Sequence, residues 1–217
     1  MELLLTLVSG LAWTIVYLEG IRLGFRDRTY AIPIAALALN FAWEATYTIR
    51  GFAGSPDVQS FVNLVWALAD VIIIVTYARF GRSELPAVVT KVLFVLWSVL
   101  LFATSFVVQW LFLAEFGADA AARYSAFLQN LLMSGLFIAM LMARRGIRGQ
   151  SLIIAVAKWI GTLAPTILFG VLERSQLILG VGLLCSVFDL VYIGLVIWVG
   201  KAAPSLQARH GGRLATA

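Results

Sequence analysis

Three carboxyl groups lie inside long apolar stretches of the sequence, where a charge is hardest to accommodate. Asp70 and Asp189 fall near the middle of such stretches, and Glu44 falls a few residues inside the edge of another. A carboxyl at membrane depth costs about 2.5–3.5 kcal/mol or more, so each one needs a reason. Low dielectric favours the neutral acid, which can deliver a proton at neutral pH. We therefore predict that Asp189, Glu44 and Asp70 are catalytic and that at least one of them is protonated.

Helical spacing places an aromatic ring and a neutral hydrogen-bonding group beside each acid, because residues three, four or seven apart share one face. These companions are predicted to bind substrate: Asn40 and Tyr47 near Glu44, Asn63 and Trp66 near Asp70, and Tyr192 near Asp189. Trp43, the neighbour of Glu44 in the sequence, is predicted to bind substrate as well. Ring faces attract cations, and more strongly where water is excluded. The combination suits a reaction that begins with protonation and proceeds through a carbocation.

Structural roles for the same residues stay open at this point. A protonated carboxyl can hydrogen-bond across neighbouring helices, and Trp and Tyr at helix ends can form an interfacial belt. No buried counter-ion for the acids is apparent, because Lys158 lies about 10 Å inside its apolar stretch and is expected to extend to the cytoplasmic interface. Glu19 is expected to pair with Arg22, and Cys185 to be a small buried residue.

The elements that carry these residues are predicted to be membrane-spanning helices. The chain has 217 residues, of which 62% are hydrophobic and 12% charged, against about 45–50% and about 25% in soluble domains. A spanning helix needs about 20 apolar residues, and alternation of the kind found in barrel strands is missing. We predict an all-α membrane protein, a seven-transmembrane-helix bundle. Its spans are residues 3–18, 30–49, 61–78, 88–114, 124–143, 151–172 and 177–199.

Basic residues alternate between the connecting segments and predict the topology. Twelve of the sixteen Lys and Arg residues lie after the first, third, fifth and seventh stretches, so the N-terminus is expected outside and the C-terminus in the cytoplasm. The first stretch is read as a span and not as a cleavable signal peptide. Residues 1–203 are predicted to form one domain, and residues 204–217 a disordered cytoplasmic tail. Short matches between the first and fifth spans suggest a parallel 3+1+3 repeat.

Several classes of function are excluded by missing motifs. The phosphate-binding loop, the zinc-protease helix and the nucleophile elbow do not occur, and the one histidine is His210 near the end of the chain. We therefore predict no metal and no cofactor. The net charge of +5 is assigned to the cytoplasmic rim of the bundle and not to a nucleic-acid site.

The string N-F-A-W-E-A-T-Y at residues 40–47 is the most specific feature of the chain. With Asp189 in the last span, it resembles the integral-membrane terpene cyclases of fungal meroterpenoid and indole-diterpene pathways, a family with bacterial relatives. The resemblance implies an enzyme that protonates a terminal alkene or epoxide of a prenylated, for example farnesylated, lipophilic substrate without metal. The family's two essential acids would correspond to Glu44 and Asp189, with Asp189 favoured as the donor. It also implies an integral protein of the bilayer, here expected in a bacterial cytoplasmic membrane.

Two other functions are compatible with seven spans. A small-solute carrier of the SWEET type also has a 3+1+3 repeat, with a binding site at the membrane midplane. A retinal-binding protein would need a Schiff-base lysine in the last span, whereas Lys158 is in the sixth. A purely structural role is the remaining alternative.

Overall fold

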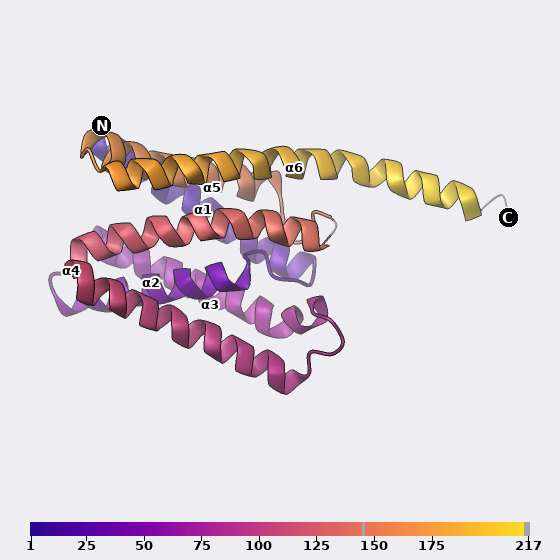
Figure 1. Ribbon diagram of the computed structural model, residues 1–217, viewed down its shortest axis with the longest axis horizontal. Coiled ribbons are helices and arrows are strands. Elements are labelled where there is room, and N and C mark those ends of the chain that lie inside the picture. The colour runs from indigo at the N-terminus through magenta and orange to yellow at the C-terminus, as the bar shows by residue number, and fades with distance from the viewer. Residues whose placement is uncertain (145, 215–217) are drawn as a thin grey trace.

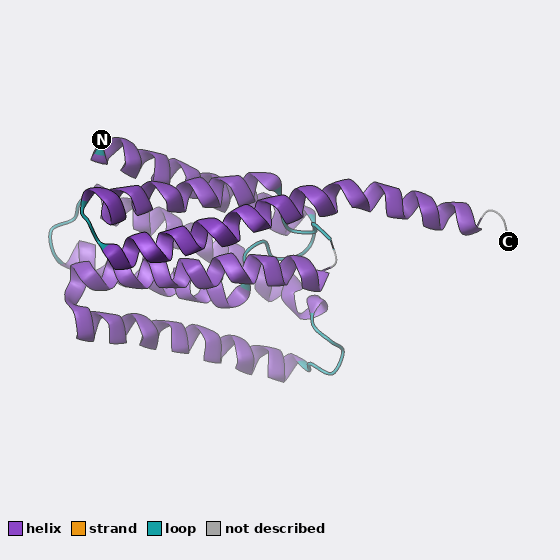
Figure 2. Ribbon diagram, turned by 45° about the horizontal axis from the view of Figure 1, so that its top comes forward, coloured by secondary structure: helices purple, strands orange, loops and turns teal. Residues whose placement is uncertain are grey.

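A computed structural model describes residues 1–144 and 146–214, and their side chains as far as Ala202. Across these residues the chain forms six α-helices, a 3-10 helix and a π-helix, and no strand (Figure 2). In chain order they are α1 (Glu2–Arg26), α2 (Ile34–Ala53), α3 (Val58–Phe80), η1 (Gly81–Glu84), α4 (Lys91–Arg144), α5 (Leu152–Pro165), η2 (Thr166–Leu172) and α6 (Gln176–Leu214). The all-α prediction is confirmed. The disordered tail predicted for 204–217 falls where side chains lie outside the described residues, and it stays a prediction.

Helix α4 folds back on itself at Gly117, as the two arms in Figure 1 show. A straight helix of 54 residues would be about 81 Å long, far more than a bilayer is thick. Gly117 has φ 71° and ψ 173°, a conformation that is essentially restricted to glycine. The buried Gln109 amide donates to Gln129 Oε1 at 3.1 Å and ties the two arms together. The arms correspond to the predicted spans 88–114 and 124–143.

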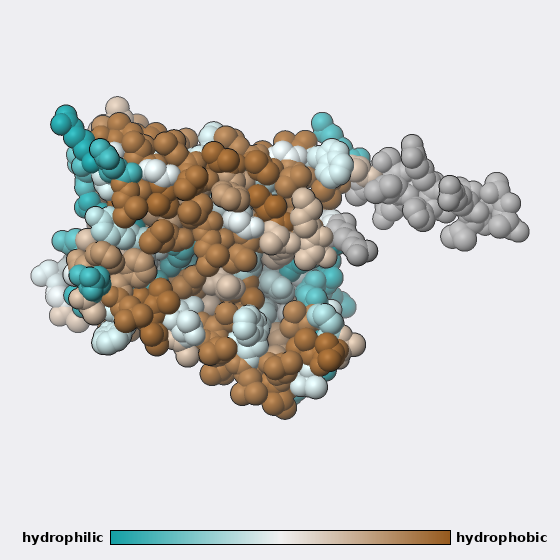
Figure 3. All heavy atoms as spheres, in the orientation of Figure 1, coloured by the Kyte–Doolittle hydropathy of each residue, from teal (hydrophilic) through white to brown (hydrophobic). Residues whose placement is uncertain are grey.

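The outer surface of the bundle suits lipid. By length and composition, five helical stretches of the described chain could cross a membrane: Glu2–Arg26, Val58–Glu84, Lys91–Arg144, Leu152–Leu172 and Gln176–Ala202. Outward-facing side chains such as Leu11, Leu100 and Val187 are more than half exposed, and hydrophobic atoms cover much of the face in Figure 3. An apolar surface of this extent marks a membrane protein. The count of seven spans and their orientation stay predictions.

One apolar core joins the helices that carry the predicted acids. It contains Tyr17 of α1, Leu37 of α2, Ile73 of α3, Phe137 of the second α4 arm and Tyr192 of α6, together with residues of α5. Small residues allow the helices to approach, as is common in membrane bundles. A Cβ added at Gly24 of α1, for example, would lie 2.9 Å from Thr76 Cγ2 of α3.

The end of α5 sets the register between α5 and α6. Pro165 lacks an N–H and cannot continue regular α-helical bonding, and the chain continues as the π-helix η2. Gly170 of η2 then packs so closely on α6 that an added Cβ would lie 2.9 Å from Leu179 Cα. This antiparallel pairing places the middle of α5 against the middle of α6.

Candidate active site

Glu44 and Asp70 are joined by a short chain of hydrogen bonds across three helices. The Asn40 amide of α2 donates to Asp70 Oδ2 of α3 at 2.9 Å and to Tyr17 Oη of α1 at 2.6 Å. The Tyr17 hydroxyl donates in turn to Glu44 Oε1 over a longer 3.4 Å. Both hydrogens of the Asn40 amide are therefore used. We call Glu44, Asp70, Asn40 and Tyr17 the acid cluster.

The two acids and Tyr17 of the acid cluster are buried, whereas Asn40 is partly exposed. Glu44 is 3% exposed and Asp70 is fully buried. Neither forms an ion pair with a basic residue of the described chain. Glu44 Oε2 and Asp70 Oδ1 also lack a hydrogen-bond partner among the described residues. An unpaired buried charge is very costly, so these surroundings favour the protonated form of both acids. The proton of each acid can be carried by the oxygen that lacks a partner, Glu44 Oε2 or Asp70 Oδ1.

Asp189 lies in a second cluster that does contain a cation. Lys158 Nζ of α5 donates to Asp189 Oδ1 of α6 at 2.8 Å and to Oδ2 at 3.1 Å. It also donates to Ser134 Oγ of the second α4 arm at 2.7 Å. The side chains of Lys158 and Asp189 are 0% and 1% exposed. We call Lys158, Asp189 and Ser134 the ion-pair cluster.

The expectation that Lys158 extends to the interface is wrong, and so is the expectation that the three acids lack a buried counter-ion. The α5 helix turns Lys158 inward, where three donors of the ammonium are matched by carboxylate and hydroxyl oxygens. A buried pair of this kind survives in low dielectric only when its remaining hydrogen-bonding capacity is satisfied. Asp189 is therefore suited to remain ionised, in contrast to the acid cluster.

Two stacked aromatic rings, Trp66 and the Tyr17 of the acid cluster, lie beside the acids. Trp66 stacks on Tyr17 with ring centroids 5.9 Å apart, and Trp66 Nε1 donates to Thr14 Oγ1 at 3.2 Å. These two rings belong to α3 and α1, and the hydroxyl of one of them contacts Glu44. The predicted association of an acid with π-faces is thus present around this cluster.

Other predicted substrate-binding residues lie outside both clusters. Trp43 packs on Tyr47 with ring centroids 4.8 Å apart and donates to the Ala122 carbonyl. Asn63 accepts a hydrogen bond from Gln59 on the same helix. Tyr192 donates to Gln150 Oε1 at 2.8 Å and packs on Phe137. The structure therefore brings together Asn40, Glu44, Asp70 and Trp66. It places Trp43, Tyr47, Asn63 and Tyr192 in other surroundings.

Sequence reasoning missed Tyr17, Ser134 and the role of Lys158. A signal existed for Tyr17, since it is the single tyrosine of the first apolar stretch and lies three residues from Thr14. Two minor expectations are confirmed. Arg22 Nε pairs with Glu19 Oε2 at 2.7 Å, and Cys185 is a buried free thiol.

Comparison with known proteins identifies the family. A family described as Pyr4-like transmembrane terpene cyclases matches residues 1–202. The Pyr4-family terpene cyclase mfmH of Annulohypoxylon moriforme is 30% identical over 169 residues, which are 76% of this chain and 68% of the relative. The terpene cyclase pyr4 of Aspergillus fumigatus is 27% identical over 198 residues, 86% of this chain and 82% of the relative. The terpene cyclase cle7 of Aspergillus versicolor is 31% identical over 169 residues, 74% and 68% of the two chains. No solved structure matches.

The chain belongs to the Pyr4-like transmembrane terpene cyclases. The predicted class, a membrane-embedded terpene cyclase, is confirmed, and the carrier alternative receives no support. The relatives are fungal, so they do not support the expected bacterial membrane. In the described part of the chain, no group of three or more His, Cys, Asp and Glu side chains is arranged to hold a metal ion. The start of the reaction without metal stays a prediction.

Proposed function

We propose that this protein isomerises a prenylated lipophilic substrate by acid-initiated cyclisation, and that Glu44 donates the initiating proton. The supporting observation is the contrast between the two clusters. Glu44 and Asp70 share neutral hydrogen-bonding partners, and no described cation is paired with either, whereas Asp189 is paired with Lys158. An acid that must give up a proton is better served by the first environment. The sequence favoured Asp189 as donor, and the ion pair reverses that preference.

The proposed reaction conserves atoms and charge. The Glu44 O–H protonates either the terminal alkene carbon or the epoxide oxygen. In the first case the π-electrons form the new C–H bond, and in the second a C–O bond breaks. Both steps leave a carbocation. Neighbouring alkenes attack in turn, each forming a C–C bond and moving the cation along the chain. The last cation loses a proton to a carboxylate, so the product is an isomer of the substrate. The Tyr17 hydroxyl stabilises the carboxylate that Glu44 becomes.

The remaining residues are assigned supporting roles. Trp66 and Tyr17 present π-faces to the cation beside the acid. Asn40 holds Asp70 and Tyr17 in position and is therefore a positioning residue. Asp189, kept ionised by Lys158, supplies negative charge to the passing cation. Trp43, Tyr47, Asn63 and Tyr192 stay candidates for contacts with the hydrocarbon chain.

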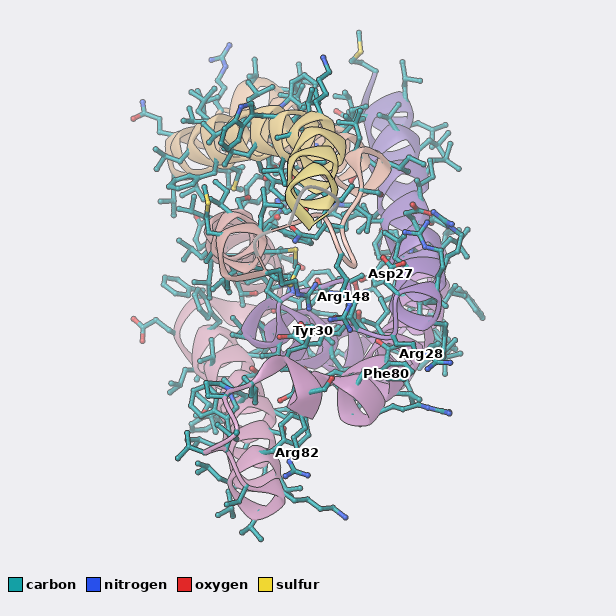
Figure 4. The ribbon with its side chains drawn as sticks, turned by 90° about the vertical axis from the view of Figure 1, so that its right-hand side faces the viewer. Asp27, Arg28, Tyr30, Phe80, Arg82 and Arg148 are labelled. Carbon is teal, nitrogen blue, oxygen red and sulfur yellow. The ribbon has the colours of Figure 1, made fainter. Side chains whose placement is uncertain are left out.

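We further propose seven crossings for the single domain of residues 1–203: α1, α2, α3, the two arms of α4, α5 with η2, and α6. The break at Gly117 supports the separation of the α4 arms. The α1–α2 connection, η1 and the α4–α5 connection gather at one end of the bundle (Figure 4). Basic residues are concentrated there, which supports a cytoplasmic assignment for that end and an outside N-terminus. The 3+1+3 repeat stays a prediction.

The proposal is tested by turnover in membranes that contain the protein. The probes are 2-farnesylhydroquinone and its terminal epoxide, and the readout is a product of unchanged mass with a new retention time. In deuterated water, alkene protonation places one deuterium on carbon, whereas epoxide opening places none. Glu44→Gln is expected to lower turnover by about 10²-fold or more, and Asp189→Asn is expected to lower it as well. Glu115→Gln, a change at an exposed acid of α4, is the matched control. Full turnover by Glu44→Gln would overturn the assignment of Glu44 as the proton donor, and full turnover by both Glu44→Gln and Asp189→Asn would overturn the proposal as a whole.

A further inference from the structure

A cavity of about 520 Å³ opens at the end of the bundle where the basic residues gather. Its inner wall is apolar, with Ile34 of α2 and Leu136 and Met140 of the second α4 arm. Its mouth is polar and includes Arg144 and Glu84. This volume lies within the range of small-molecule sites, about 300–1,000 Å³. The division between an apolar wall and a polar mouth suits a ligand that is itself amphiphilic.

Arg144 lines this cavity, and its guanidinium has one donor without a partner among the described residues. Its side chain is 7% exposed and its Nε lies 3.6 Å from Glu84 Oε2. The guanidinium carbon lies 4.5 Å from the centre of the Tyr30 ring, and Nη1 donates to the Arg148 carbonyl at 3.1 Å. Arg144 Nη2 is buried and has no hydrogen-bond partner among the described residues. A buried charged donor without an acceptor is costly, and the cost is relieved when a ligand supplies the acceptor.

The other polar groups of the mouth are already engaged. Arg148 Nη1 lies 3.0 Å from Glu84 Oε1, and its Nε and Nη2 donate to the Asp27 and Arg28 carbonyls at 3.1 and 2.8 Å. Thr29 Oγ1 also donates to Glu84 Oε1. Figure 4 shows Arg148, Tyr30 and Asp27 gathered at this end. Two guanidinium groups therefore share one carboxylate, and the positive excess favours an anionic or oxygen-rich ligand.

We propose that this cavity binds the oxygen-bearing head group of the prenylated substrate, and that Arg144 Nη2 donates to a carboxylate, phenolate or carbonyl oxygen of that group. The inference rests on the proposed function and adds to it a head-group class and a site. No residue of the acid cluster or the ion-pair cluster lines the cavity, so the site is separate from the proposed chemistry. It would hold one end of the substrate while the other end reacts.

The spacing along the helices agrees with a head group bound at the cavity and a reacting end at the acids. Arg144 lies ten residues after Ser134 on α4, and Glu44 lies ten residues after Ile34 on α2, so each step covers about 15 Å. A chain of three isoprene units has twelve main-chain bonds and extends about 14 Å, at about 1.2 Å per bond as in extended backbone. Leu136 and Met140 pack against the same core that contains Tyr17. A head group at Arg144 thus places the terminal isoprene at the level of the acids.

Equilibrium binding to the full chain in phosphatidylcholine nanodiscs tests the proposal without turnover. Three probes share one farnesylthio chain: farnesylthiosalicylic acid, its methyl ester and farnesyl phenyl sulfide, which has no oxygen. We expect the acid to bind about tenfold or more tightly than the sulfide, with the ester between them. Arg144→Gln should reduce this preference to less than about threefold while the affinity for the sulfide is unchanged. Arg82→Gln, at an exposed arginine of η1 at the same end, should keep the full preference.

Two further variants keep the test decisive if Arg144→Gln fails to fold. Arg144→Lys keeps the charge but loses the planar fork, and is expected to retain part of the preference. Ala139→Phe fills the cavity from its wall and is expected to weaken all three probes together. Equal binding of the three probes to the unaltered protein would overturn the proposal. Full preference in both Arg144 variants would overturn it too, and so would displacement of the acid probe by dihexanoyl phosphatidylglycerol, which would assign the site to lipid head groups.

The outcome is separable from that of the proposed function. Glu44→Gln should bind the acid probe with the preference of the unaltered protein, because Glu44 does not line the cavity. A retained preference together with full turnover by Glu44→Gln and Asp189→Asn would remove the proposed chemistry and leave the head-group site. If the unaltered protein cyclises the substrate but binds the three probes equally, the head-group site is removed and the proposed chemistry is retained.

Discussion

Lys158 Nζ lies 2.8 Å from Asp189 Oδ1, and both side chains are withdrawn from the surface. The same bundle holds Glu44 and Asp70 with neutral partners, and no cation of the described residues is paired with either. Two kinds of buried carboxyl therefore coexist, one suited to stay ionised and one suited to stay protonated. When the surroundings of two carboxyl groups favour opposite protonation states, one group can act as an acid and the other as a charged stabiliser.

Removal of Lys158 alone should be strongly destabilising. Lys158→Met leaves the Asp189 charge buried without a partner, and loss of one partner of a buried pair costs about 3–5 kcal/mol. Lys158→Met combined with Asp189→Leu removes both charges and should recover most of that loss. Chemical unfolding in detergent micelles measures both effects.

Turnover separates stability from function in the same variants. The double variant should be folded and inactive, because Asp189 is proposed to act on the cation. Cyclisation at the unaltered rate by the double variant would show that the ion pair is only structural. Ser134→Ala, which removes one acceptor of Lys158, should cost about 1–3 kcal/mol and serves as the milder comparison.

Hairpin geometry made part of the site predictable from the sequence. Asn40 and Asp70 are equally distant from residue 55, in the α2–α3 turn, so an antiparallel pair of helices brings them level. Lys158 and Asp189 are nearly symmetric about the connection between η2 and α6 in the same way. Composition and basic-residue placement supplied the helical membrane class, because lipid restricts the possible structures.

The direction in which each residue faces was not predictable. Lys158 has a side chain long enough to reach an interface, and only its packing against Ser134 and Asp189 from two other helices turns it inward. Tyr17 similarly joins the acid cluster through residues of α2 and α3. These contacts depend on helix rotation about the axis, which is decided by the whole core. Periodicity within one helix cannot supply it.

Asn40 should be required for activity more than for folding. Asn40→Leu keeps the volume but removes the donor to Asp70 Oδ2 and Tyr17 Oη. We expect a loss of about 1–3 kcal/mol in unfolding free energy, and a fall in kcat of about tenfold or more since the acid cluster loses its bridge. The measurements are chemical unfolding and initial rates over a range of substrate concentrations.

Gln109→Leu is the matched control for this prediction. The Gln109 amide also donates between helical segments, to Gln129 Oε1, but it belongs to neither cluster. Its replacement should lower stability by a similar amount and leave kcat within about threefold. Equal losses of kcat in the two variants would remove the special role of Asn40.

Acid should loosen the end of the bundle that carries the cavity. The hydrogen bond from Arg26, together with the Gly149 backbone N–H, holds the pKa of Asp27 below its ordinary value. Because the folded pKa is depressed, the stabilisation is complete above the unfolded value of about 3.9 and is lost as pH falls through the folded pKa. Hydrogen exchange at Gly149 should therefore be unchanged from pH 7 to 5, after correction for the intrinsic rate, and rise below about pH 4. Asp27→Asn should remove this extra rise, and a rise that persists in Asp27→Asn would assign it to other groups.

Gly117 should be the least replaceable glycine of α4. Its φ of 71° and ψ of 173° are costly for any residue with a Cβ, by about 1–3 kcal/mol. The cost is conformational, because an added Cβ meets nothing within 4 Å. Gly117→Ala should therefore lower the unfolding free energy and shift part of the protein to a state with separated arms. A spin-label pair at positions 109 and 129, which are in hydrogen-bond contact in the folded protein, should show this as a longer second distance.

Gly135→Ala, in a helical part of α4 with equal free space, should instead be neutral or stabilising by up to about 1 kcal/mol. Equal stability of the two variants would mean that the reversal of α4 does not depend on the conformation of Gly117.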